Sequence, residues 1–83
     1  MHPKGYKMSA TSLGQFVASR RKSLKLTQQE LAAKAGVGLR FIRELEGGKP
    51  TLRMDKVNDV LHLFGHELVP GPLSADDQQA SKP

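Results

Sequence analysis

The sequence predicts an all-α domain of four or five helices followed by one short C-terminal strand. Three observations lead to this fold class. Apolar residues recur at helical spacing between residues 13 and 64. Residues that typically start or end helices lie at intervals within this stretch. A single short segment, residues 66–70, has the pattern of a strand. A chain of 83 residues is long enough for one domain.

We expect four regions along the chain. Residues 1–11 mix Pro, Gly, Lys and Ser with little periodicity, which predicts a flexible arm. Residues 12–65 hold the periodic apolar positions and form the domain. Residues 66–70 are the expected strand, and residues 71–83 are polar, which predicts a disordered tail.

The first helix is expected to begin at Ser12, which would cap it. Its apolar face consists of Leu13, Phe16, Val17 and Leu24. Four cations crowd its end: Arg20, Arg21, Lys22 and Lys25. Cations at the end of a helix interact favourably with its dipole, so these residues have a structural explanation before any functional one.

Residues 26–46 predict two short amphipathic helices joined by a tight turn. The Thr27 hydroxyl can accept a hydrogen bond from the Glu30 amide, and Glu30 can reach back to Thr27, which makes a capping box. The apolar stripe that follows consists of Leu31, Ala32 and Ala35. Gly36 is expected to end this helix, because glycine easily adopts a positive φ.

The second of these helices, residues 39–46, is expected to point Ile42 and Leu45 inward, after a turn made by Val37 and Gly38. Arg40 and Arg43, three positions apart, then share the exposed face. This layout is that of a helix-turn-helix. Two outward arginines on a short helix suit insertion into the DNA major groove.

A turn at residues 47–50 precedes the last helix, residues 53–64, for which Thr51 is the expected cap and Gly65 the expected end. This helix would bury Val57, Val60, Leu61 and Phe64. A lone strand at residues 66–70 needs a partner edge, so we predict that it pairs with the same segment of a second copy. The alternative is an extended tail that lies on the helices of its own chain.

Composition argues against several functional classes. There is no cysteine, and the three histidines at positions 2, 62 and 66 lack the companions of a zinc site, so we expect no metal and no cofactor. Neither a nucleophile nor an acid pair accompanies His62 and His66, so we do not expect an enzyme.

No segment has the roughly 18 apolar residues of a membrane span, and the first residues have no apolar core resembling a signal peptide. We therefore expect a cytoplasmic, nucleoid-associated protein that does not enter a membrane.

Charge is unevenly distributed along the chain. Residues 1–56 contain twelve Lys or Arg against four acidic residues, whereas residues 57–83 contain one Lys against four. The front part therefore carries +8 and the rear part −3. Such a division is typical of a nucleic-acid binder with a separate protein-facing side. The alternative is that the cations only keep a small domain in solution.

The residues LTQQELAAKAGV, followed by IRELEGGK, resemble the XRE/Cro-like helix-turn-helix family of bacterial and phage repressors. The resemblance covers about residues 12–65 and implies a lambda-repressor-like DNA-binding domain. The continuation GGKPTLRMDKVNDVLHLFGHELVP looks more like the HipB-type antitoxins. This second resemblance implies a homodimer closed by C-terminal strands, palindromic operator DNA as ligand, and a HipA-like Ser/Thr kinase toxin as partner.

The resemblance also implies roles for individual residues. Those expected at DNA are Gln28, Gly38, Leu39, Arg40, Phe41, Arg43, Lys49 and Arg53, with Lys25 as a further candidate. Gln28 would contact a phosphate and brace the recognition helix, residues 39–46, and Arg40 and Arg43 would read guanine. Arg21 and Glu46 would form a structural ion pair, and the dimer strand would contain Glu67, Leu68 and Val69. Gly38 departs from the family pattern, in which Ser or Thr usually caps this helix.

Several alternatives stay open on the sequence alone. Phe41 can press on a thymine methyl group or pack against neighbouring helices. Lys49 and Arg53 can contact phosphates or serve only as solvated charges. The protein as a whole is predicted to be a homodimeric repressor and antitoxin. The alternatives are a stand-alone transcriptional regulator without a toxin, or a small basic protein that binds nucleic acid without sequence preference.

Overall fold

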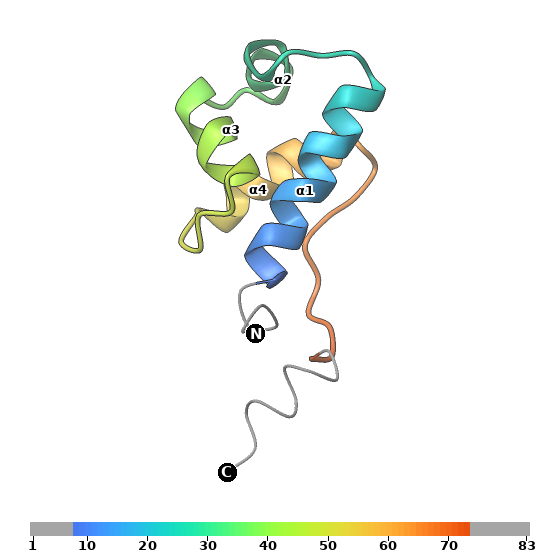
Figure 1. The fold of residues 1–83 in the computed structure, drawn as a ribbon, viewed down its shortest axis with the longest axis vertical. Helices are drawn as coiled ribbons and strands as arrows, with labels where there is room; N and C mark the ends of the chain where they lie inside the picture. Colours follow the sequence, from blue (N-terminus) through green and yellow to red (C-terminus); the bar gives the residue numbers. More distant parts are fainter. Residues whose placement is uncertain (1–7, 74–83) are drawn as a thin grey trace.

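The computed structural model describes residues 8–73, with side chains from Ser12 onward, and these residues form four helices (Figure 1). The helices are α1 (Met8–Ser23), α2 (Gln28–Ala35), α3 (Leu39–Glu46) and α4 (Met54–His62). No strand is present between residues 8 and 73. The all-α class predicted from the sequence is therefore confirmed for this part of the chain.

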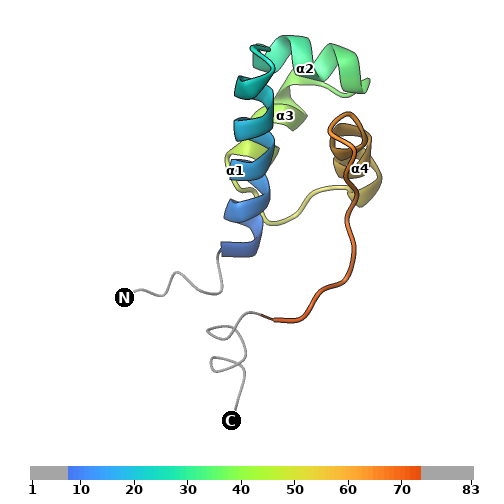
Figure 2. The same ribbon diagram turned by 90° about the vertical axis from the view of Figure 1, so that its right-hand side faces the viewer.

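One apolar core joins all four helices. Its fully buried side chains are Val17, Leu31, Ile42, Leu45 and Val60, with Ala32, Val57 and Leu61 almost as deep. Burial of one such large side chain stabilises the fold by about 1.5 to 3 kcal/mol. Helix α3 packs against both α1 and α2, and α4 packs against α2. Figure 2 shows α1 and α4 on opposite sides, with α2 across their upper ends.

Helix α1 differs from its prediction at both ends. It begins at Met8, so Ser12 lies inside the helix rather than capping it, and residues 8–11 of the predicted arm belong to the helix. Residues 1–7 of that arm lie outside the described residues. At the other end α1 stops at Ser23, and Leu24 is 57% exposed instead of joining the apolar face. The reason is the turn at Lys25, whose φ of 60° carries the chain out of helical register.

The boundaries of α2 and α3 confirm the predicted pair of short helices. Thr27 and Glu30 form both bonds of the capping box, and Gly36 ends α2 in the left-handed conformation with φ 73°. Gly38 is the N-cap of α3 and provides no side-chain bond, as expected for a residue without a side chain. Both helix starts are thus determined by residues that can be recognised locally.

Helix α1 approaches the end of α3 closely at Gly14, which is buried. A Cβ atom at this position would lie 2.6 Å from the Leu45 carbonyl oxygen and 2.8 Å from that of Glu46. Real Cβ atoms do not come this close to backbone oxygens, so the packing of α1 on α3 requires glycine here. This contact determines how the end of α3 sits on α1.

Helix α4 also starts differently from its prediction. Its N-cap is Arg53, without a side-chain bond, so Thr51 does not cap it. At its end the amide of His66 donates to the Leu61 carbonyl at 3.0 Å, and Gly65 has φ 73°, as the predicted stop requires. Phe64, expected in the core, is only partly buried and packs against it.

The segment after α4 lies partly on the helices of its own chain. The Leu68 amide donates to Asn58 Oδ1 at 2.8 Å, and the Leu68 side chain packs against the core. The His66 ring stacks edge-on against Phe16, with 4.8 Å between centroids. In Figures 1 and 2 the segment runs toward the end of the molecule at which α1 begins. In the single chain, the segment thus lies on the helices of its own chain. Pairing of this segment with the same segment of a second copy stays a prediction.

No helix within residues 8–73 is both long enough and apolar enough to cross a membrane.

Candidate nucleic-acid interface

Helix α3 presents one apolar and one cationic face. Ile42 and Leu45 are 0% and 1% exposed, so the inner face is anchored in the core. Arg40 and Arg43 lie on the other side and are exposed, as the helical spacing predicted. The Arg40 side chain is 91% exposed. A short, anchored helix with outward guanidinium groups has the shape and charge needed to enter a major groove.

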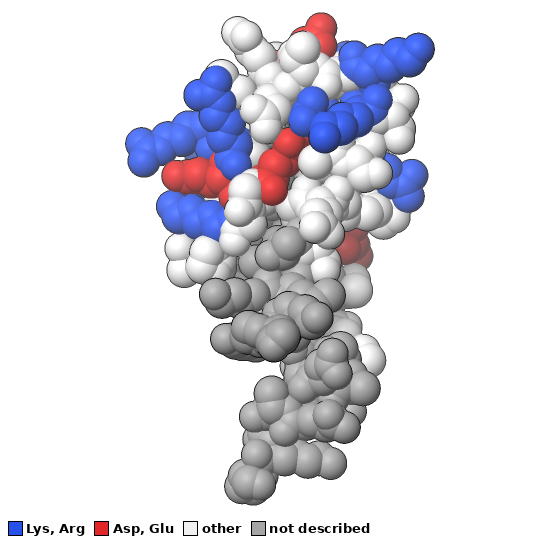
Figure 3. All heavy atoms as spheres, in the orientation of Figure 1, with Lys and Arg blue, Asp and Glu red and all other residues white. Residues whose placement is uncertain are grey.

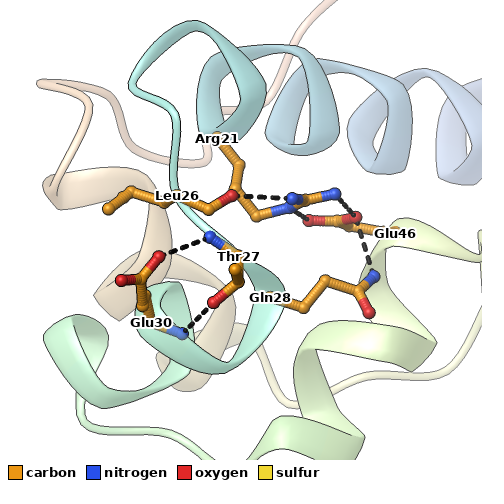
Figure 4. Close-up of polar contacts among 6 residues, drawn as sticks. All are labelled: Arg21, Leu26, Thr27, Gln28, Glu30 and Glu46. Carbon is orange, nitrogen blue, oxygen red and sulfur yellow. Dashed lines mark hydrogen bonds and ion pairs between the residues drawn. The ribbon is translucent and has the colours of Figure 1, made fainter.

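A cluster of polar side chains fastens the end of α3 to α1 and α2 (Figure 4). Arg21 Nε donates to Glu46 Oε2 at 2.7 Å, and Arg21 Nη2 donates to Glu46 Oε1 at 3.0 Å. Gln28 Nε2 also donates to Glu46 Oε1 at 3.0 Å, and Arg21 Nη1 donates to the Leu26 carbonyl at 2.8 Å. The structure thus brings together Arg21 and Glu46, the pair that the resemblance implied.

The electrostatics of this cluster favour its charged form. Partial burial acts to raise the pKa of Glu46, but the hydrogen bonds from Arg21 and Gln28 outweigh it, so that the pKa is lowered. The hydrogen bond to Glu46 in turn raises the pKa of Arg21, against a smaller effect of burial. The side chains are only 13% and 8% exposed, so the pair is largely removed from water. Gln28 therefore braces α3 in this structure by donating to Glu46.

The start of α2 is fixed by the capping box seen in the same view (Figure 4). The Glu30 amide donates to Thr27 Oγ1 at 3.0 Å, and the Thr27 amide donates to Glu30 Oε1 at 2.8 Å. Bonding to Thr27, first of all to its backbone amide, lowers the pKa of Glu30. Because Gln28 occupies the first position of α2, this cap also places the Gln28 side chain beside Glu46.

The exposed side of α3 combines cations with one acidic group. Glu44 Oε2 lies 3.3 Å from Arg40 Nε and 3.4 Å from Lys49 Nζ. Arg43 forms no ion pair within residues 8–73. Figure 3 shows Lys and Arg side chains on the α3 side of the molecule and also on the opposite side of the same face, with acidic atoms among them. The candidate interface is therefore basic but not uniformly so.

Arg53 lies just before α4 and is engaged by a neighbour. Its Nε and Nη2 donate to the two carboxylate oxygens of Asp55 at 3.1 and 2.6 Å. The hydrogen bond from Arg53 lowers the pKa of Asp55 and raises that of Arg53. Both side chains are exposed, so solvent screens this pair and a phosphate can compete for the guanidinium.

The remaining residues expected at DNA lie at the start of α3. Gly38 is exposed and caps the helix, and Leu39 is half-buried. Phe41 is half-buried and packs against the core, which favours the packing alternative for this residue. Lys25 is exposed in the turn after α1. Of the predicted dimer strand, Glu67 and Val69 are exposed and Leu68 is half-buried.

Within residues 8–73 no group of three or more His, Cys, Asp or Glu side chains is placed to hold a metal ion. His62 and His66 are exposed. His66 Nδ1 lies 2.7 Å from the Phe64 carbonyl oxygen, which accounts for the orientation of its ring.

Comparison with known sequences agrees with this geometry. Residues 17–68 match the family HTH_3, described as helix-turn-helix, and the match spans α2, α3 and α4. The chain belongs to this helix-turn-helix family. It is also 53% identical over 53 residues to a protein of Sinorhizobium fredii (strain NBRC 101917 / NGR234) named as an uncharacterized HTH-type transcriptional regulator, y4mF. The aligned part covers 64% of this chain and 70% of that protein.

Membership of the helix-turn-helix family confirms the resemblance to XRE/Cro-like proteins, a family of DNA-binding transcriptional regulators. Neither the family match nor the similar protein distinguishes HipB-type antitoxins from other members of the family. The resemblance to these antitoxins therefore stays a prediction. In this family α2 and α3 are the two helices of the motif, so the cluster around Glu46 supports the second of them.

Three features of the helix-turn-helix site were missed from the sequence. These are the shared position of Glu44 between two cations, the bond from Arg21 to the Leu26 carbonyl, and the close approach at Gly14. The spacing of Arg40 and Glu44, four apart on one helix, is the local signal that would have indicated the first. The other two depend on how α1 crosses the motif and have no local signal.

Proposed function

We propose that this protein is a sequence-specific DNA-binding transcriptional regulator that places α3 in the major groove. The observation that carries this proposal is the exposure of Arg40 and Arg43 on a helix whose opposite face is fully buried. The buttress of Arg21 and Gln28 on Glu46 supports it, because a recognition helix has to be held rigidly to read bases.

The two arginines would read bases, and other cations would bind the backbone. A guanidinium can donate two hydrogen bonds to O6 and N7 of guanine, and each such pair gives about 1 to 3 kcal/mol of discrimination. Lys49 lies within the segment between α3 and α4 and Arg53 at its end, and we expect both to contact phosphates. Phosphate contacts release counterions, so affinity is expected to fall steeply with salt concentration.

The active species proposed is a homodimer acting as a repressor on palindromic operators. Two copies related by a twofold axis would present their α3 helices about 34 Å apart, one turn of B-DNA. Support comes from the small size of the core and from the exposed apolar side chains Val69 and Leu73 in the segment after α4. The dimer would act in the cytoplasm, at the nucleoid.

A further part of the proposal is that the regulator is the antitoxin of a HipA-like kinase toxin and controls its own operon. The observation that favours it is the likeness of the stretch after α3 to HipB-type antitoxins. Co-expression with the product of a neighbouring kinase-like gene tests it: a stable complex supports the antitoxin role. If the neighbourhood contains no such gene, the alternative of a stand-alone regulator replaces it.

DNA binding itself is tested by selection from a random duplex library with the wild-type chain at fixed salt. We expect enrichment of a palindromic sequence, and subsequent titrations should show a marked preference for that duplex over random DNA. Equal affinity for selected and random duplex would instead establish a basic protein that binds nucleic acid without sequence preference, and the proposal would be wrong.

A further inference from the structure

Four arginines near the motif use their nitrogen atoms in different ways. Arg21 donates from all three nitrogens, and Arg53 presents its fork of Nε and Nη2 to Asp55. Arg40 is held only through Nε, by Glu44 Oε2 at 3.3 Å. Its two terminal nitrogens bond to no other residue of the described chain, and Arg43 makes no ion pair there.

Glu44 holds a second cation with the same oxygen. Lys49 Nζ lies 3.4 Å from Glu44 Oε2, and the Lys49 amide donates to the Glu44 carbonyl oxygen at 3.0 Å. The Glu44 side chain is 28% exposed, compared with 91% for Arg40 and 46% for Lys49. The carboxylate is therefore the least exposed of the three groups and lies at the helix surface between two longer side chains.

A carboxylate on a face that meets phosphates lowers affinity for any duplex, because like charges repel. Such a group can still improve discrimination if it restricts where the neighbouring cations go. Holding Arg40 by Nε leaves the two terminal nitrogens available to donate to a base, and a guanidinium already held loses less rotational freedom when it docks there. Neutralising part of the charge of Lys49 also weakens contacts that carry no sequence information.

We infer that Glu44 is a positioning residue for specificity: it holds Arg40 for base reading and restrains Arg40 and Lys49 from binding phosphates of unrelated sequences. This inference rests on the proposed function. It assigns a role to an acidic residue of α3 that acts through its neighbours and touches no base itself.

The test compares Glu44→Gln with the wild type on the selected operator and on random duplex of equal length. The substitution keeps the size of the side chain and removes its charge. Affinity for random duplex is expected to rise about two- to fivefold, the range that exposed charge pairs produce, while affinity for the operator stays the same or falls. The specificity ratio therefore decreases, and the salt dependence on random duplex becomes steeper.

Asp55→Asn is the matched control. It also removes one negative charge beside an arginine, but Arg53 lies outside the recognition helix. Affinities for operator and random duplex should rise together, leaving the ratio unchanged. A second control is Glu44→Gln in an Arg40→Ala background, where the ratio should not change further. The group that Glu44 positions for base reading is gone there, and a released Lys49 would contact phosphates of both duplexes alike.

The inference is overturned if Glu44→Gln leaves the specificity ratio unchanged, if Asp55→Asn lowers it equally, or if the effect persists without Arg40. Circular dichroism melts of each variant verify that the fold is retained. Failure of the proposed function looks different, because the wild-type chain would then select no preferred sequence at all.

Discussion

The charged side chain of Glu46 is 8% exposed and accepts hydrogen bonds from Arg21 and Gln28, which belong to different helices. Taking a carboxylate out of water costs free energy, and only good geometry with opposite charge and hydrogen bonds offsets that cost. Both carboxylate oxygens are satisfied here, by the forked guanidinium of Arg21 and the amide of Gln28. The cluster therefore contributes mainly by fixing the end of α3, and it becomes destabilising once a partner is lost.

Replacing Arg21 with Met should lower the free energy of unfolding by about 3 kcal/mol, because Glu46 then stays buried without its cation. Urea denaturation followed by circular dichroism measures this change. Arg53→Met is the matched control: it removes an exposed partner of an ion pair and should have a much smaller effect. Equal losses for the two variants would show that burial of the Arg21 pair has no energetic consequence.

The lowered pKa of Glu46 predicts a loss of stability in acid. Its ordinary value is 4.5, and the folded protein lowers it, so below about pH 5 the unfolded chain binds more protons than the folded one. The ionised Glu46 thus makes its full contribution to the free energy of unfolding above its ordinary pKa. This contribution is lost as the pH falls through the lowered pKa. Urea midpoints of the wild type and Glu46→Gln between pH 7 and pH 3 should converge toward the acid end. A constant difference between the two would contradict this origin.

At the scale of elements, the motif depends on how closely α1 meets the end of α3. Gly14 lies at that crossing, and the two carbonyl oxygens beside it belong to Leu45 and Glu46. Seven residues further along α1, Arg21 reaches Glu46. The close backbone approach and the ion pair thus both involve the last turn of α3, and together they set the orientation of this helix.

Gly14→Ala should therefore destabilise the protein although alanine favours helices. The added methyl group would meet backbone oxygen at 2.6 Å, so α1 and α3 have to separate, with an expected cost of about 1 to 3 kcal/mol. Thermal denaturation measures the loss. Ser19→Ala, at an exposed position of the same helix, should be neutral or slightly stabilising. If Gly14→Ala behaves like this control, the contact does not constrain the packing.

The elements differ in how far the sequence could predict them. The start and end of α2 and the start of α3 depend on local signals, Thr27 with Glu30 and the glycines at 36 and 38, and these were predictable. The start of α1 and the cap of α4 were predicted wrongly, because Ser12 and Thr51 look like caps but the chain forms its helix starts elsewhere. Leu24 fitted the apolar spacing, yet the helix ends before it.

The same division holds for the candidate site. Outward placement of Arg40 and Arg43 follows from helical spacing once Ile42 and Leu45 are buried, so it could be predicted. The resemblance implied that Gln28 braces α3, but its hydrogen bond to Glu46 and the contact of Glu44 with Lys49 depend on the distances between these side chains. Only the folded chain provides these distances.

At the scale of the whole molecule, the cations over α3 and the exposed apolar side chains after α4 lie in different parts of the chain. Val69 and Leu73 are 69% and 55% exposed, whereas Leu68 in the same segment is held against the core. Water-exposed apolar residues next to an anchored one fit a surface that a second copy would cover. The proposed dimer thus has one surface for its partner and another for DNA.

Deleting residues 66–83 should weaken self-association, because the segment that carries these apolar side chains is lost. Sedimentation equilibrium over a range of concentrations measures the dissociation constant. Deletion of residues 74–83 alone is the control, since it keeps His66, Leu68 and Val69, and it should leave association close to that of the full chain. An unchanged dissociation constant after the longer deletion would exclude a dimer closed by this segment.

The central claim is that α3 reads bases with its outward arginines, and base-pair discrimination by Arg43→Ala tests it most directly. Arg43 makes no ion pair in the described chain, so its loss disturbs no other contact of that kind. The wild type should prefer the selected operator over a duplex changed at one particular base pair by about 1 to 3 kcal/mol, and Arg43→Ala should lose that preference while retaining its preferences elsewhere. If Arg43→Ala instead weakens binding to every sequence by the same factor, the arginine only contacts phosphate and the claim is wrong.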